Sequence, residues 1–177
     1  LVSFVFLRTP TDSVDVPDSQ LSLIPFPIDE IFLEELKNFD LIFFDDFSYR
    51  SYFNVLYLEK VRDFVRAGGG LAMLGGIRSF DSGGYAETPL REVLPVELDG
   101  KGNFSTGSAL RGVLTAPGKT HPITRLVPDL RANEEAWKKM PLLTNLNLVL
   151  RPKGETLLQA APDGASGGSP LLTVGKF

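Results

Sequence analysis

The sequence of 177 residues contains no cysteine and a single histidine, His121. Without cysteine the chain has no thiol nucleophile, no disulfide and no cysteine-ligated metal cluster. Both a reducing and an oxidising compartment are compatible with this absence. Any hydrolase of the serine–histidine type would have to use His121 as its base.

The chain also lacks clustered basic residues and long apolar runs. Its net charge of −4 and the scattered lysines and arginines argue against nucleic-acid binding, which depends on grouped positive charge. No apolar run reaches the roughly 18 residues that a membrane-spanning helix needs. A dinucleotide fingerprint follows a strand, whereas Gly68-Gly69-Gly70 precedes one, so we expect no cofactor.

What is present suits one domain over residues 1–177, because 43% of the residues are hydrophobic. In the first half, helical spacing of apolar residues predicts helices over residues 28–39 and 53–65. Apolar runs predict strands over residues 2–7, 41–44 and 71–74. Strand and helix alternate, so we expect a parallel sheet with helices on both faces.

Beyond Leu98 the pattern weakens, and a more irregular, partly antiparallel second half is expected. Short strands are predicted over residues 113–115, 148–150 and 157–160. Leu1 opens directly into a strand-like run without an initiator Met, and the chain stops soon after Leu171-Leu172-Thr173-Val174. We therefore expect a segment of a longer protein, truncated at both ends.

Candidate site residues follow the predicted strands, where ligands bind in open α/β sheets. Asp45 and Asp46 could hold a metal or act as acid and base, but neighbours in an extended chain point to opposite sides. A cap or solvated turn is the favoured interpretation. Gly75-Gly76 and Gly83-Gly84, with Arg78 alongside, could form an anion-binding nest, although glycines in tight loops more often serve backbone conformation.

Two serines in the same loop raise the question of hydrolysis. Asp81-Ser82-Gly83-Gly84 matches the nucleophile sequence of chymotrypsin-like proteases, but those β-barrels place histidine before serine, so we interpret the match as chance. No G-x-S-x-G elbow is present. His121 precedes a proline, and a structural hydrogen-bonding role is favoured for it.

One block of the sequence has a distinctive pattern, made of Gly68 to Gly76, Arg78-Ser79-Phe80, Gly83-Gly84-Tyr85, Thr88-Pro89-Leu90 and Val93-Leu94-Pro95-Val96. Further residues that belong to the pattern are Leu41 to Asp46, Tyr49, His121-Pro122-Ile123, Trp137 and Pro141-Leu142-Leu143. With these residues the sequence resembles the glutamine-amidotransferase-like domain of bacterial membrane-associated proteins, a branch of the class I glutamine amidotransferase-like superfamily.

The resemblance implies a flavodoxin-like three-layer sandwich with a mostly parallel sheet and room for an antiparallel extension. Active relatives carry a cysteine on the turn after the strand equivalent to residues 71–74. Here that turn reads Gly75-Gly76-Ile77-Arg78, which supplies no nucleophile. The relatives' histidine lies near the end of the domain, and we do not transfer its role to His121. The resemblance also implies membrane anchoring through segments outside this sequence, with the extracytoplasmic side slightly favoured.

The sequence thus predicts a non-catalytic module that binds a small polar ligand or a protein partner. The expected pocket consists of Asp45, Asp46, Gly75, Gly76, Arg78, Ser79, Tyr85 and His121. The alternative is a hydrolase that uses Ser79 or Ser82 with His121, or a metal at Asp45 and Asp46. A scaffold domain in a membrane complex is a third possibility.

Overall fold

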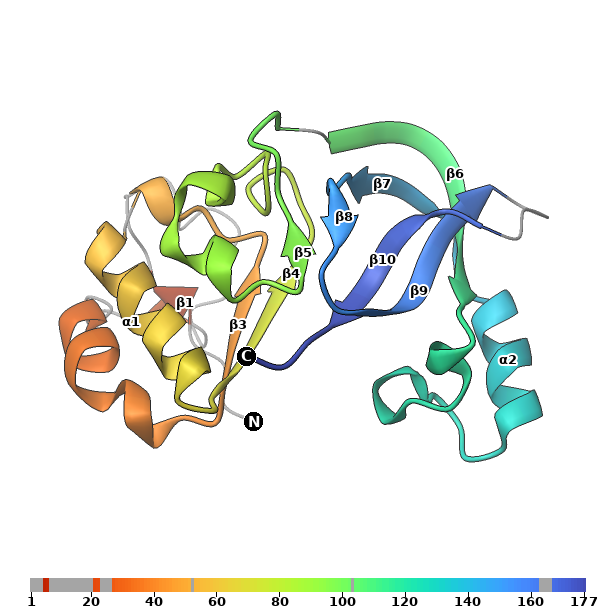
Figure 1. Cartoon of the computed structure of the whole chain (residues 1–177), viewed down its shortest axis with the longest axis horizontal. Helices are drawn as coiled ribbons and strands as arrows, with labels where there is room; N and C mark the ends of the chain where they lie inside the picture. The colour runs from red at the N-terminus through yellow and green to blue at the C-terminus, as the bar shows by residue number, and fades with distance from the viewer. Residues whose placement is uncertain (1–4, 7–20, 23–26, 52, 103, 163–166) are drawn as a thin grey trace.

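The computed structural model describes residues 5–6, 21–22, 27–51, 53–102, 104–162 and 167–177. Two parts lie side by side (Figure 1). We call residues 27–98 the α/β part and residues 104–174 the antiparallel part. Most of the sequence-predicted strand at residues 2–7 lies outside the described residues, which retain only its Val5–Phe6 portion, strand β1. This strand pairs in parallel with β2, Leu21–Ser22.

The α/β part places its helical segments on one side of a short pair of strands. Its elements are η3 (Glu30–Glu35), η4 (Leu36–Asn38), β3 (Leu41–Asp45), η5 (Tyr49–Ser51), α1 (Val55–Arg66), β4 (Gly70–Leu74), η6 (Tyr85–Glu87) and η7 (Pro89–Glu92). The helix predicted over residues 28–39 is helical but irregular, because η3 is a π-helix and η4 a 3₁₀ turn.

Helix α1 forms where its apolar periodicity predicts it. Asn54 caps it, since its side-chain oxygen accepts a hydrogen bond from the Leu56 amide at 3.1 Å. Gly68 ends it with φ +104°, a conformation that glycine adopts without strain. The inward face is closely packed, because Leu58 and Val61 are 0% exposed.

Strands β3 and β4 pair in parallel, in the register Leu41 with Gly70 through Asp45 with Leu74. Ile42, Phe44 and Met73 face α1 and join the hydrophobic core. On the opposite face, Phe43 is 62% exposed. The expectation of a strand buried on both faces is therefore wrong for β3, because a short apolar run does not show how many of its faces are covered.

The antiparallel part holds the largest described sheet. Its four strands run in the order β10 (Ser169–Val174), β9 (Glu155–Pro162), β6 (Phe104–Leu114) and β7 (Leu143–Asn147), and each neighbouring pair is antiparallel. Its short helices are η8 (Pro117–Lys119) and η9 (Pro122–Thr124). Helix α2 (Leu130–Lys138) packs against β6 (Figure 1). A small pair, β5 (Val96–Glu97) with β8 (Arg151–Pro152), connects the two parts.

This architecture corrects the predicted fold class. A flavodoxin-like sandwich needs a continuous parallel sheet between two helical layers, whereas the parallel sheets described here have two strands each. The antiparallel sheet is the main sheet and not an extension of a parallel one. Local periodicity identified β3, α1 and β4 but could not show which strands far along the chain would pair.

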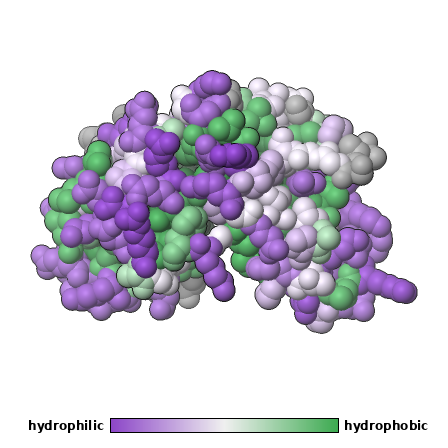
Figure 2. Space-filling model, viewed as in Figure 1, coloured by the Kyte–Doolittle hydropathy of each residue, from purple (hydrophilic) through white to green (hydrophobic). Residues whose placement is uncertain are grey.

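The surface is mixed in character. Figure 2 shows polar residues interspersed with apolar ones, and the outline is notched between the two parts near the C-terminal end of the chain. No helix among the described residues is long and apolar enough to cross a lipid bilayer.

Candidate functional site

The turn after β4, residues 75–85, closes on itself through its own backbone. The amide of Ser79 donates to the carbonyl of Gly76 at 3.2 Å, that of Gly83 to Ser79 at 2.9 Å, and that of Tyr85 to Phe80 at 2.9 Å. We call this segment the β4 turn. The amides of Ser79, Gly83 and Tyr85 therefore already have acceptors within the turn, unlike the free amides of an open anion-binding nest.

Asp46 secures the start of the β4 turn. Its carboxylate accepts the Arg78 backbone N–H at 2.7 Å and the Arg78 Nε–H at 3.2 Å. A side chain at Gly76 would collide with this carboxylate, so glycine at that position lets Asp46 approach. Asp45, its neighbour, is exposed at the end of β3. This arrangement agrees with the cap interpretation of Asp46, and Asp45 does not share in the contact.

Asn147, at the end of β7, holds the β4 turn from the other side. Its side-chain oxygen accepts the Gly76 amide at 2.8 Å, and its side-chain nitrogen donates to the Gly76 carbonyl at 2.9 Å. The same nitrogen lies 3.0 Å from the hydroxyl of Ser82. Asn147 is only 8% exposed, so it links the two parts through a buried polar network.

The two serines proposed as nucleophiles bond to neighbouring carbonyls. Ser79 is 1% exposed and donates to the carbonyl of Leu74 at 2.6 Å. Ser82 donates to the carbonyl of Ser79 at 2.8 Å. Neither hydroxyl has a hydrogen bond to His121 within the described part of the chain, so the structure does not assemble a serine–histidine pair there.

Tyr85 and Asp81 complete the base of the β4 turn. Tyr85 is fully buried, and its hydroxyl donates to the carbonyl of Phe47 at 2.7 Å. Burial, with contributions from Tyr49 and Asp46, raises the pKa of Tyr85 above its usual value. Asp81 accepts the backbone amides of Asp99 and Gly100 at 3.0 and 2.9 Å, a structural role that the sequence did not reveal.

The β4 turn therefore brings together most of the predicted pocket residues, but as a closed structural unit. Asp46, Gly76, Arg78, Ser79 and Tyr85 all contribute to it. Within the residues that the structure covers, no group of three or more His, Cys, Asp or Glu side chains is placed to hold a metal ion.

His121 lies apart from the other predicted residues. In Figure 1 its segment is near α2 at the lower right, whereas the β4 turn lies at the top of the molecule. His121 caps η9, because its Nδ1 accepts the Ile123 backbone N–H at 3.2 Å. His121 therefore has the structural hydrogen-bonding role that the sequence favoured. That role uses Nδ1, and among the described residues Nε2 has no hydrogen-bond partner.

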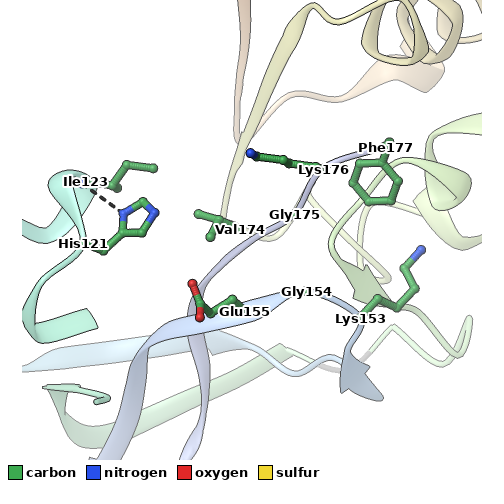
Figure 3. Close-up of a pocket in the computed structure, with 9 residues that line it drawn as sticks. All are labelled: His121, Ile123, Lys153, Gly154, Glu155, Val174, Gly175, Lys176 and Phe177. Atoms are coloured by element: carbon green, nitrogen blue, oxygen red, sulfur yellow. Dashed lines mark hydrogen bonds between the residues drawn. The ribbon is translucent and has the colours of Figure 1, made fainter. Parts of the chain in front are cut away.

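The other edge of the His121 ring faces a cavity of about 470 Å³ (Figure 3). This cavity is formed by η9, the beginning of β9 and the end of β10 with the residues that follow. Its lining residues are His121, Ile123, Lys153, Gly154, Glu155, Val174, Gly175, Lys176 and Phe177. Volumes of this size are typical of small-molecule sites.

The pairing of β9 with β10 shapes the cavity. Glu155 stands opposite Val174 in that ladder. Gly154 precedes it, and a side chain there would collide with the Val174 carbonyl, so only glycine allows this close approach. The two strands therefore end together, and their terminal side chains surround one opening.

Lys153 also lines the cavity but is already engaged. Its ammonium group donates to the carbonyl of Arg91 at 2.7 Å and lies 5.9 Å from the centre of the Phe177 ring. Burial lowers the pKa of Lys153 below its usual value. The Lys153 ammonium group therefore helps to hold the cavity wall in place, because it is already hydrogen-bonded within the protein.

The sequence did not indicate Asn147, Glu155 or Lys176. Asn147 lies at the end of a polar stretch, and nothing local shows that it reaches residues 71 positions away. In the sequence, Glu155 and Lys176 are two charged residues with no distinguishing pattern around them. Only the antiparallel pairing of β9 with β10 brings them together, and both are exposed. No family model matches the chain, and no curated protein matches its sequence.

Proposed function

We propose that this chain is a non-catalytic binding module and that the cavity beside His121 is its ligand site. The observation that carries the proposal is the contrast between the two places where polar side chains gather. In the β4 turn the polar side chains form hydrogen bonds within the protein. At the cavity, by contrast, the Nε2 edge of His121 and the charged side chains of Glu155 and Lys176 face the opening.

The sequence supports the non-catalytic part of the proposal. The β4 turn begins Gly75-Gly76-Ile77-Arg78 and holds no cysteine; its Ser79 is buried, and the hydroxyl of its half-buried Ser82 donates to the Ser79 carbonyl. We further propose a sequence relationship to the amidotransferase-like domains of membrane-associated proteins, supported by the block from Gly68 to Val96 alone. Membrane association, with the extracytoplasmic side slightly favoured, is part of that proposal and concerns segments outside this sequence.

The test is a thermal-shift screen of small polar molecules on three proteins. Wild type is compared with His121→Ala, which removes a cavity group, and with Ser82→Ala, which removes a hydroxyl of the β4 turn. Ligands are expected to raise the melting temperature of wild type and Ser82→Ala and to lose that effect in His121→Ala. Binding raises stability in proportion to the logarithm of ligand concentration over Kd.

Two outcomes contradict the proposal. If no molecule stabilises wild type, the chain is not a small-molecule module, and a protein partner becomes the better hypothesis. If a ligand's effect disappears in Ser82→Ala and persists in His121→Ala, the binding site is the β4 turn and not the cavity.

A further inference from the structure

The cavity beside His121 offers a defined hydrogen-bond donor. Because Nδ1 accepts a backbone N–H, a neutral His121 ring carries its proton on Nε2. Figure 3 shows this second nitrogen pointing toward Val174, across the cavity. A bound acceptor such as a carboxylate could receive a hydrogen bond there without disturbing the η9 cap.

Two opposite charges face the same opening. Glu155 begins β9, and Lys176 follows the end of β10, so the strand pairing brings both to one end of the sheet. Figure 3 shows the Lys176 side chain extending above Val174 toward the side where His121 lies, and the Glu155 carboxylate below Val174 on the same side. Within the described residues, neither side chain has an ion-pair partner.

The remaining walls supply apolar surface. Ile123 is 61% exposed and Phe177 is 51% exposed, and both line the cavity with Val174. A ligand that covered them would gain about 25 cal/mol for each Å² of apolar area removed from water. The cavity therefore combines a donor, the charges of Glu155 and Lys176 and an apolar wall, and Lys153 adds a positive charge that is hydrogen-bonded to the Arg91 carbonyl.

We propose that the cavity binds a small zwitterion of the amino-acid class. Its carboxylate lies against the His121 Nε2–H and Lys176, its ammonium group against Glu155, and its apolar side chain against Ile123 and Val174. A ligand with only a negative charge would be repelled by the Glu155 carboxylate. A ligand with only a positive charge would be repelled by the Lys176 ammonium group. This inference rests on the proposed function and specifies the ligand of the same site.

Three probes with one carbon skeleton separate the charges. L-leucine carries both charges, 4-methylpentanoate lacks the ammonium group, and 3-methylbutylamine lacks the carboxylate. Each is titrated into the ¹⁵N-labelled chain, and Kd is read from amide shifts around His121, Glu155 and Val174. Leucine is expected to bind at least about tenfold more tightly than either single-charge probe, since each of those probes loses one charge-assisted hydrogen bond.

Charge-neutralising variants assign each end of the ligand. Glu155→Gln should remove the preference for leucine over 4-methylpentanoate, and Lys176→Gln should remove the preference for leucine over 3-methylbutylamine. Glu34→Gln and Lys37→Gln are the matched controls, because both residues are exposed in the α/β part on η3 and η4. The controls should keep the wild-type order of affinities.

The outcomes distinguish this inference from the proposed function. If 4-methylpentanoate or 3-methylbutylamine binds as tightly as leucine and shifts the cavity amides, the cavity is a ligand site but the zwitterion assignment fails. If no probe shifts those amides, and the thermal-shift screen also finds no ligand, both proposals fail. If Glu155→Gln binds leucine as tightly as the wild type does, Glu155 does not contact the ammonium group of the ligand.

Discussion

The α/β part and the antiparallel part are held together by different interactions. In the first, aromatic rings and aliphatic side chains form one cluster, with Phe32 and Phe53 at 4.6 Å and Phe47 and Phe53 at 4.8 Å between ring centres. In the second, helix α2 is anchored by polar groups. Asn133 is 1% exposed and donates to the carbonyl of Thr124 at 3.1 Å, which also accepts the indole N–H of Trp137 at 2.7 Å.

This difference explains which part carries the candidate ligand site. Apolar packing is non-directional and fills the core of the α/β part, and hydrogen bonds from the backbone, Asp46 and Asn147 close the β4 turn above that core. Directional hydrogen bonds fix the loops of the antiparallel part while leaving a cavity where strands end. Three experiments test whether the two parts are stabilised by different interactions and whether they unfold as one unit.

The largest effect is expected from Leu58→Ala in α1. Leu58 is 0% exposed, and truncation of such a leucine lowers the free energy of unfolding by about 2–5 kcal/mol. Urea unfolding is followed by far-UV circular dichroism and by the fluorescence of Trp137, the single tryptophan, which lies in the other part. Both signals should shift together, because Val149 of the connection packs on the aromatic core and the backbone amide of Lys153 donates to the carbonyl of Pro95.

Leu157→Ala in β9 is the matched variant, since Leu157 is also 0% exposed. It should shift the same two signals by a similar amount. If Leu58→Ala moves the circular dichroism and leaves the Trp137 transition in place, the parts unfold separately, and the chain is not one cooperative unit.

A smaller effect is expected from Asn147→Ala, which removes the link between the parts. The Gly76 amide would lose its acceptor and the Gly76 carbonyl would lose one of its donors, and an unsatisfied buried group costs about 1–3 kcal/mol. Asn145→Ala, an exposed residue of β7, serves as control and should change stability by less than about 0.5 kcal/mol. Equal stability of the two variants in urea unfolding would mean that Asn147 does not couple the parts.

The comparison also shows what the sequence could predict. Strands β3 and β4 and helix α1 were predicted because apolar runs, helical spacing and Gly68 are local signals. Asp46 as a cap and His121 as a hydrogen-bonding residue followed from the same local chemistry. The helices and strands of the α/β part were therefore predictable. Their arrangement was not, because β3 and β4 form a two-stranded sheet and not a larger parallel sheet with helices on both faces.

The antiparallel part was largely unpredictable for physical reasons. Strand β6 lacks clear alternation, contains Gly107 at φ +76° and pairs with residues more than 30 positions away. Helix α2 has few apolar residues, since Asn133 and Trp137 position it through hydrogen bonds. Residues 148–150, predicted as a strand, instead connect β7 to β8. The cavity could not be foreseen because its residues meet only through these distant pairings.

The smallest effect is expected from Tyr85→Phe, which removes one hydrogen bond from the closed base of the β4 turn. Loss of the bond to the Phe47 carbonyl should cost about 0.5–1.5 kcal/mol near pH 7. Tyr49→Phe is the control, because its bond to the Gly84 carbonyl is long at 3.3 Å and only partly buried. Urea unfolding should show little change for this control.

The pH dependence makes the Tyr85 prediction specific. Burial raises the pKa of Tyr85 in the folded state, whereas the unfolded phenol titrates at about 10. The neutral phenol therefore stabilises the fold fully below pH of about 10, and that stabilisation is lost as pH rises further, at up to about 1.4 kcal/mol per pH unit. The wild type should lose its advantage over Tyr85→Phe between about pH 10 and pH 11. A constant difference across that range would mean that Tyr85 ionises freely and that the β4 turn is open to water.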